Sequence, residues 1–114
     1  MHADTKAERP EPNSNYVEVA VEVFGLLADA TRIRIILALR EGELSVNHLA
    51  DIVDRSAAAV SQHLAKLRWG KIVRVRQDGN RMFYRLADEH ARRLVTEAIL
   101  QAEHAVDDVP RHHT

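Results

Sequence analysis

Apolar residues recur at three- and four-residue spacing through four successive segments of the chain. This spacing places them on one face of a helix. Side chains that start helices and glycines that end them separate the segments: the candidate N-caps are Asn15, Asp29 or Thr31, Ser45 and Ser56, and the candidate stops are Gly42 and Gly70. The pattern predicts helices over about 16–27, from Asp29 or Thr31 up to Gly42, over 46–53 and over 57–69.

Each predicted helix carries its own apolar stripe. The stripes are Val19, Val23, Phe24 and Leu27 in the first helix, Ile33, Ile36, Leu37 and Leu39 in the second, Leu49, Ile52 and Val53 in the third, and Val60, Leu64 and Leu67 in the fourth. The stripes of the third and fourth helices are expected to be buried, since an amphipathic helix turns its apolar face to the core.

After Gly70 the pattern changes from helical spacing to an alternation of apolar and polar residues. Residues 72–76 and 81–86 are rich in β-branched and aromatic side chains, which favour strands. The residues between them, Gln77-Asp78-Gly79-Asn80, favour a tight turn, because glycine and asparagine tolerate positive φ. A β-hairpin is therefore predicted, and four arginines are expected to point away from the core: Arg74, Arg76, Arg81 and Arg85.

The flanking segments complete the predicted organisation. Asp88 is a candidate N-cap for a last helix over about 89–105. The order of four helices, a hairpin and a helix predicts a mainly α domain over residues 15–105 with a winged helix-turn-helix fold. Residues 1–14 are polar and lack an apolar period, so a disordered arm is expected there, and residues 106–114 form a His-containing tail.

Basic residues are concentrated around the predicted fourth helix and the hairpin. The net charge of the chain is −1, but residues 55–85 contain eight Lys or Arg against Asp78 alone, a net of +7. Residues 1–54 have a net charge of −5 and residues 86–114 a net charge of −3. Binding to DNA depends on a local basic surface more than on the mean charge, so a nucleic-acid partner is expected.

The fourth helix is the candidate for the major groove of double-stranded DNA. Its first half is small and polar, so it can approach base edges closely. Serine, glutamine and histidine side chains there can bond to bases, whereas basic side chains suit phosphates, and the hairpin arginines could also enter the minor groove. The predicted DNA-contacting residues are Ser56, Ser61, Gln62, His63, Lys66, Arg74, Arg76 and Arg81.

Other function classes are disfavoured by what the sequence lacks. It has no cysteine, which excludes disulfides and thiolate metal sites. No apolar run approaches the roughly 20 residues that span a bilayer, and the polar N-terminus does not have the pattern of a signal peptide, so a cytoplasmic protein with no membrane partner is expected. No Ser/His/Asp triad is placed by spacing and no Gly-rich phosphate loop occurs, so an enzyme is not expected.

Three motifs together resemble the ArsR/SmtB family of metal-responsive repressors. They are Leu27-Ala28-Asp29-Ala30-Thr31-Arg32 followed by Ile36-Leu37, the stretch SQHLAKL at 61–67, and Gly79-Asn80-Arg81 with Tyr84-Arg85-Leu86. The resemblance covers about residues 16–105. It implies a homodimer, joined through the terminal helices, that binds operator DNA without metal and releases it when metal binds.

The same resemblance points to the last helix as the metal-binding element. The arsenic and cadmium sensors of the family have cysteines at the start of the third helix, where this chain has none. Asp88 and His90 match the Asp-x-His pair of the family, and His104 matches the last ligand. The histidine expected eleven residues after His90 is replaced by Gln101, a poor ligand, which counts against the usual tetrahedral zinc site.

Spacing along the last helix ties metal binding to dimerisation. His90 and His104 are separated by about 21 Å along a helix axis, so one helix cannot bring both to one ion. The two positions nevertheless fall on nearly the same face. An antiparallel partner helix would set His90 beside the partner's His104, and two-fold symmetry would create two such sites per dimer.

The end of the chain resembles the mycobacterial nickel/cobalt sensor of the family, in which the last helix and the C-terminal tail supply ligands. The candidate ligands are Asp88, His90, Glu103, His104, His112 and His113. Five or six nitrogen and oxygen ligands favour octahedral Ni(II) or Co(II) over tetrahedral Zn(II). A Ni(II)- or Co(II)-responsive repressor is therefore predicted; the alternatives are a zinc-responsive repressor, a family DNA-binding protein without metal sensing, and a metal carrier.

Overall fold

Side-chain caps define the helical frame of the computed structural model, which describes residues 10–108. Three helices begin where a side-chain oxygen accepts a hydrogen bond from a backbone N–H three residues further on. These bonds join Asp29 to Arg32 at 3.0 Å, Ser45 to His48 at 3.2 Å and Ser56 to Ala59 at 3.1 Å. They begin α3 (Ala30–Ala38), α4 (Val46–Val53) and α5 (Ala57–Trp69), so Asp29 rather than Thr31 caps the second predicted helix.

The core lies where α3, α4, α5 and the hairpin meet. Its fully buried side chains include Ile35 and Ile36 from α3, Leu49 from α4, and Val60, Leu64 and Leu67 from α5. The predicted burial of the α5 stripe is therefore confirmed. The prediction for Ile52 is wrong, because its side chain is 51% exposed. At about 100° per residue, Ile52 lies beyond the edge of the α4 face that Leu49 and Val53 turn to the core.

The hairpin forms as predicted and gains a third strand. Strands β2 (Val73–Asp78) and β3 (Arg81–Leu86) pair antiparallel, and Gly79 in the turn has a φ of +63°. A two-residue strand, β1 (Leu44–Ser45), pairs with the other edge of β3, which gives the sheet order β1-β3-β2. Two residues are too few to show an alternating pattern, so the sequence does not predict β1. This strand joins the base of the wing to the segment that leads into α4.

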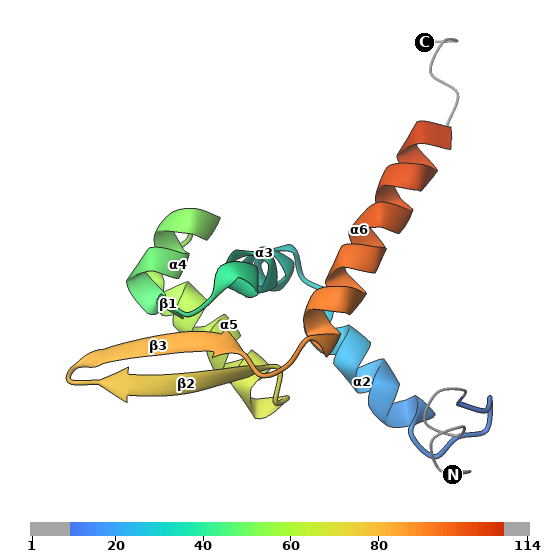
Figure 1. Ribbon diagram of the computed structural model, residues 1–114, viewed down its shortest axis with the longest axis horizontal. Coiled ribbons are helices and arrows are strands. Elements are labelled where there is room, and N and C mark those ends of the chain that lie inside the picture. The colour runs from blue at the N-terminus through green and yellow to red at the C-terminus, as the bar shows by residue number, and fades with distance from the viewer. Residues whose placement is uncertain (1–9, 109–114) are drawn as a thin grey trace.

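The first helix, α2 (Val17–Leu27), contacts the core with only part of its apolar surface. Leu27 is buried and Val23 is half-buried, whereas Val19 and Phe24 are 52% and 59% exposed. The helix runs out from the body near the start of the last helix (Figure 1). An apolar face of α2 is therefore left without cover within the described part of this single chain.

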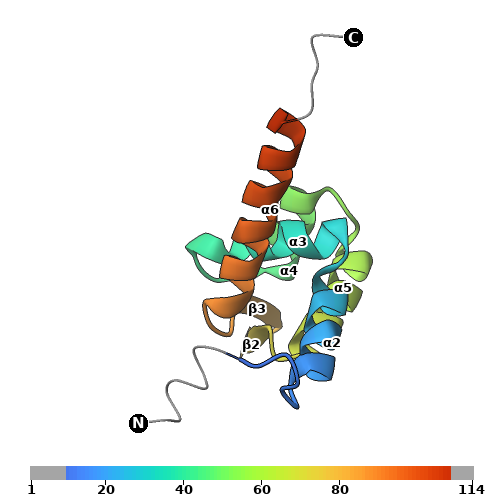
Figure 2. The same cartoon turned by 90° about the vertical axis from the view of Figure 1, so that its right-hand side faces the viewer.

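The last helix, α6 (His90–Asp108), also leaves the body of the domain. Its first turns pack on the core through the buried Ala91 and Val95, and the rest projects past the other elements (Figures 1 and 2). All side chains from Leu100 to Asp107 are exposed. None of the described helices is both long enough and apolar enough to cross a membrane.

Two helix ends differ from the sequence prediction. Asn15 does not cap α2: Tyr16 occupies the N-cap position and makes no side-chain capping bond. At the other end of the chain α6 continues to Asp108, three residues beyond the predicted end at Ala105. The short 3₁₀ helix η1 (Leu39–Glu41) connects α3 to Gly42, where the chain turns toward β1.

Candidate nucleic-acid interface and metal-binding residues

A left-handed residue makes the turn of the helix-turn-helix. Asp54 follows α4 with φ of 56° and ψ of 53°, and its backbone N–H bonds to the carbonyl of Ala50. The cap of α5, Ser56, follows two residues later. The chain thus reverses within a few residues, and the first turns of α5 lie at the surface.

The outer face of α5 contains polar side chains opposite its buried stripe. Ser61, Gln62 and Lys66 are exposed, as the predicted DNA-contacting face requires. Ser56 is exposed as well, but its Oγ already accepts a hydrogen bond from Ala59 N at 3.1 Å. Its hydroxyl keeps a proton to donate, so Ser56 can cap the helix and contact a phosphate at the same time.

His63 has a different environment from its neighbours on α5. It is half-buried, and its Nδ1 accepts a hydrogen bond from Arg32 Nε at 3.1 Å. Arg32 lies in the first turn of α3 and also donates from one terminal nitrogen to the carbonyl oxygen of Leu26 at 3.2 Å. The sequence pattern groups His63 with Ser61 and Gln62, whereas the structure places it in contact with another helix.

The strand register brings the four wing arginines to one face of the hairpin. Arg74 is opposite Arg85, Arg76 is opposite Phe83, and Asp78 is opposite Arg81. Residues directly opposite in an antiparallel pair point to the same side of the sheet. The four arginines are all exposed, as predicted. We call Arg74, Arg76, Arg81, Phe83 and Arg85 the wing face.

Phe83 and Glu43 organise two arginines of the wing face. The guanidinium carbons of Arg76 and Arg81 lie 4.8 Å and 5.1 Å from the centre of the Phe83 ring. Arg76 also donates to both carboxylate oxygens of Glu43, with a shortest distance of 2.8 Å. These hydrogen bonds lower the pKa of the Glu43 carboxyl below its ordinary value and raise the pKa of Arg76. The pair is therefore ionised at neutral pH.

Three residues that shape this interface could not be identified from local sequence patterns: Arg32, Glu43 and Phe83. Arg32 and Glu43 act through contacts with residues 31 and 33 positions away. Phe83 belongs to the aromatic run that predicts a strand, and Arg32 follows the cap motif of α3. Neither pattern indicates which side chains Arg32 and Phe83 contact, because those contacts depend on how the helices and the wing pack.

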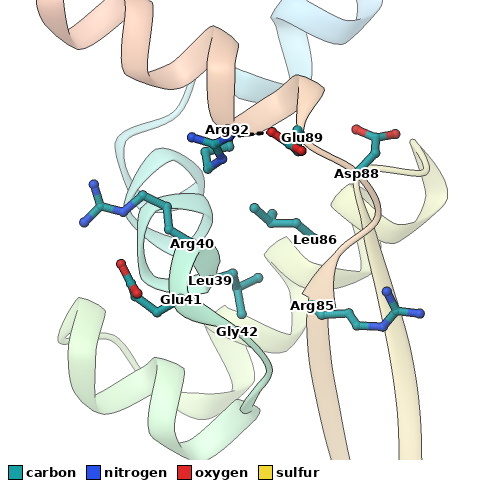
Figure 3. A pocket seen from close by; sticks show the side chains of 9 residues that line it. All are labelled: Leu39, Arg40, Glu41, Gly42, Arg85, Leu86, Asp88, Glu89 and Arg92. Carbon is teal, nitrogen blue, oxygen red and sulfur yellow. Dashed lines mark hydrogen bonds and ion pairs between the residues drawn. The ribbon is translucent and has the colours of Figure 1, made fainter.

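The first candidate metal ligands lie where β3 passes into α6. Asp88 Oδ1 accepts a hydrogen bond from His90 N, the first residue of α6, at 2.9 Å. The predicted N-cap is wrong by one residue, because Glu89 precedes His90 and its carbonyl accepts the first bond of the helix, from Arg93 N. His90 is exposed. Figure 3 shows Asp88 at the edge of a pocket above Leu39 and Leu86, next to Glu89, whose carboxylate forms a 2.7 Å ion pair with Arg92. Asp88 and His90 are therefore held near each other by the hydrogen bond between them.

The remaining candidate ligands are far from Asp88 and His90. Glu103 and His104 are exposed on the projecting end of α6, while His112 and His113 lie outside the described residues. Over residues 10–108, no three His, Asp or Glu side chains are close enough to hold a metal ion. Within residues 10–108 the chain thus places potential ligands at both ends of α6 but does not bring them together.

Comparison with known proteins identifies the family. A family model described as "Bacterial regulatory protein, arsR family" matches residues 29–74. The chain is 50% identical over 99% of its length to the HTH-type transcriptional regulator KmtR of Mycobacterium tuberculosis, of which it covers 85%. It is 36% identical over 88% of its length to the HTH-type transcriptional repressor SmtB of the same species, of which it covers 77%.

A solved structure supports the same assignment. The homodimeric winged helix-turn-helix DNA-binding domain of a possible ArsR-family regulator from Mycobacterium bovis matches with a TM-score of 0.71 at 26% identity, over 90% of this chain and 98% of that one. The predicted winged helix-turn-helix is thus confirmed. The relatives are regulators and not enzymes, as expected from the sequence. This chain belongs to the ArsR/SmtB family of winged helix-turn-helix transcriptional regulators.

Proposed function

We propose that this protein is a repressor that binds operator DNA as a homodimer and releases it when Ni(II) or Co(II) binds at α6. The observation that carries the DNA-binding part is the wing face. Arg74 and Arg85 are directly opposite in the strand register and both are exposed. Like charges in this arrangement repel each other, and a phosphate bound between them would remove the repulsion.

In this proposal α5 enters the major groove and the wing contacts the adjacent backbone. Ser61, Gln62 and His63 would contact base edges, because their side chains offer hydrogen-bond donors and acceptors. The other predicted residues would contact phosphates: Ser56, Lys66, Arg74, Arg76 and Arg81. The exposure of Gln62 and Lys66 on α5 supports this division, since neither is needed to complete the core.

The proposed homodimer covers the apolar surface that α2 and α6 expose. Val21 and Phe24 on α2 are 63% and 59% exposed, and Leu100 on α6 is 45% exposed. Apolar patches of this kind on a small domain mark interaction surfaces. A second copy of the chain is the proposed partner, in keeping with the homodimeric domain from M. bovis.

The proposed metal site is formed between the α6 helices of the two subunits. The exposed face of α6 leaves His90 and His104 accessible, with the donors Asp88 and Glu103 beside them. Imidazole and carboxylate without sulfur suit Ni(II), Co(II) or Zn(II). Tail ligands His112 and His113 would raise the ligand number toward six, which favours Ni(II) or Co(II). Metal and DNA then oppose each other reciprocally, so DNA must weaken metal binding as much as metal weakens DNA binding.

Mixing two inactive variants tests whether the site is shared. His90→Ala and His104→Ala homodimers should each lose Co(II) binding and metal-induced release of DNA. In a mixed dimer one site has both alanines and the other has both histidines. Random re-association should therefore restore about a quarter of the wild-type Co(II) binding. His48→Ala, at an exposed histidine on α4, is the matched control and should behave as the wild type.

The outcomes of this experiment separate the possibilities. No recovery on mixing would mean that the histidines act within one chain or only structurally. If both single variants still release DNA on metal binding as the wild type does, His90 and His104 on α6 are not needed for metal sensing. A protein that binds DNA with the same affinity with or without Ni(II) would be a family member without metal sensing.

Zinc is the second candidate for the metal, because Gln101, a poor ligand, stands where the usual tetrahedral zinc site has a histidine. The absorption spectrum of the Co(II) form distinguishes the two kinds of site. Intense tetrahedral absorption bands of the Co(II) form would support a zinc-like site with few ligands. Weak octahedral bands would support the six-ligand Ni(II)/Co(II) site that includes the tail.

A further inference from the structure

Arg32 joins the end of α2 to the proposed base-reading helix. Its guanidinium donates to the Leu26 carbonyl oxygen at 3.2 Å and to His63 Nδ1 at 3.1 Å. Its own backbone N–H is fixed by the Asp29 carboxylate at 3.0 Å. Arg32 and His63 are both half-buried, so the bond is partly protected from competing water. The guanidinium thus has a defined position relative to three helices.

This contact determines which ring nitrogen of His63 carries the proton. A guanidinium has only hydrogen-bond donors, so the nitrogen that it contacts must be the unprotonated acceptor of a neutral imidazole. The acceptor is Nδ1, and the proton is then on Nε2. A doubly protonated ring has no acceptor and would lose the bond to Arg32.

We infer that Arg32 is a positioning residue that holds His63 as the Nε2–H tautomer, so that α5 offers a hydrogen-bond donor to an acceptor atom of a base. This inference rests on the proposed contact of α5 with the major groove. The acceptors available there are N7 and O6 of guanine, N7 of adenine and O4 of thymine. His63 would therefore favour a base with such an acceptor, and Arg32 would affect sequence preference without contacting DNA.

The tautomer can be measured without DNA. Long-range proton–nitrogen NMR spectra of the full-length protein should show His63 as the Nε2–H tautomer. Arg32→Met removes the donor while keeping a long side chain, and it should give a mixture of tautomers. Arg32→Lys keeps a positively charged donor and should restore part of the wild-type signal. Arg34→Met, at an exposed arginine of α3 that forms no hydrogen bond or ion pair within residues 10–108, is the control. An Nε2–H tautomer that is unchanged in Arg32→Met would overturn the inference.

Base preference is measured by selecting sites from a random duplex library with each variant. Loss of one hydrogen bond should reduce discrimination at one base position about 2- to 10-fold in Arg32→Met and in His63→Ala. The double variant should lose no more than His63→Ala alone, because Arg32 acts through His63. Circular dichroism shows whether each variant is folded, and Arg32→Lys provides the comparison if Arg32→Met is not.

Two results would contradict the base contact. Equal weakening on all sequences in His63→Ala would mean that His63 contacts a phosphate. An unchanged preference in His63→Ala would mean that it contacts no base. Failure of the wild type to select any sequence would instead count against the proposed DNA-binding function, and the NMR result would still test the role of Arg32.

Discussion

Arg76 on the wing donates hydrogen bonds to both carboxylate oxygens of Glu43, at distances from 2.8 to 3.2 Å. Glu43 lies between η1 and β1, so this ion pair joins the wing to the body of the domain. The pair also neutralises one of the four arginines of the wing face. Arg76 therefore has to exchange Glu43 for a phosphate if it contacts DNA.

Glu43→Gln should release Arg76 from its 2.8 Å ion pair with Glu43, leaving only the longer 3.8 Å ion pair with Asp78, and should strengthen binding to DNA. We expect about two- to fivefold tighter binding to a non-specific duplex at low salt, because an exposed ion pair no longer competes with the phosphate. One additional phosphate contact should steepen the dependence of log K on log salt concentration by about 0.9. Fluorescence anisotropy over a series of salt concentrations measures both effects.

Glu41→Gln is the matched control for this change. Glu41 lies two residues away, is exposed, and forms no hydrogen bond or ion pair within the described residues. It shares the general effect of removing a negative charge but frees no arginine. Equal effects of the two substitutions would mean that Arg76 does not contact DNA, and weaker binding by Glu43→Gln would mean that the pair is needed to orient the wing.

Asp29→Ala should destabilise the domain in a pH-dependent way. The hydrogen bond from Arg32 N to the Asp29 carboxylate lowers the pKa of that group below its ordinary value of 3.8. Its stabilising effect is therefore present above the ordinary pKa and is lost as the pH falls through the lowered one. At neutral pH the loss of the cap should reduce the free energy of unfolding by about 1 kcal/mol, measured by urea denaturation.

Asp29→Asn separates the cap from the charge. Asparagine caps helices about as well as aspartate, so this variant should retain most of the stability at neutral pH. The difference in the free energy of unfolding between Asp29→Asn and Asp29→Ala should not change with pH. The difference between the wild type and Asp29→Ala should shrink below about pH 4. If the wild type is more stable than Asp29→Ala by the same free energy at neutral pH and below about pH 4, the role of the carboxylate is contradicted.

Lys71→Gly should stabilise the domain. Lys71 has a φ of 64°, a left-handed conformation in which a Cβ is unfavourable. Removing the Cβ of Lys71 should raise the free energy of unfolding by about 1 kcal/mol. Lys71→Ala, which removes the charge but keeps the Cβ, should give no such gain in the same urea titration.

Phe24→Glu should produce monomers. If a second copy covers α2, a carboxylate at this 59% exposed position would be buried without a partner. Analytical ultracentrifugation should show dissociation, and Co(II) binding should be lost with it. Ile52→Glu makes the same kind of change at a 51% exposed apolar residue on α4 and should leave the dimer intact. A dimeric Phe24→Glu protein would place the interface elsewhere.

The sequence by itself determined the features that depend on neighbouring residues. Ser45 and Ser56 were recognisable as caps because each bonds to a backbone N–H only three positions away. The buried stripe of α5 and the turn at Gly79 follow from local periodicity and backbone conformation. The predicted DNA-contacting and metal-binding sets stay predictions. Their described members are exposed, except His63, which is half-buried.

Only the tertiary structure decided the contacts between distant segments. Local patterns did not indicate that Arg32 contacts His63, that Glu43 occupies Arg76, or that β1 pairs with β3. They also gave Ile52 a buried position that the packing of α4 does not provide. The physical reason is that periodicity and capping involve residues within a few positions of one another, whereas these contacts depend on how separate helices and strands are oriented once the core has formed.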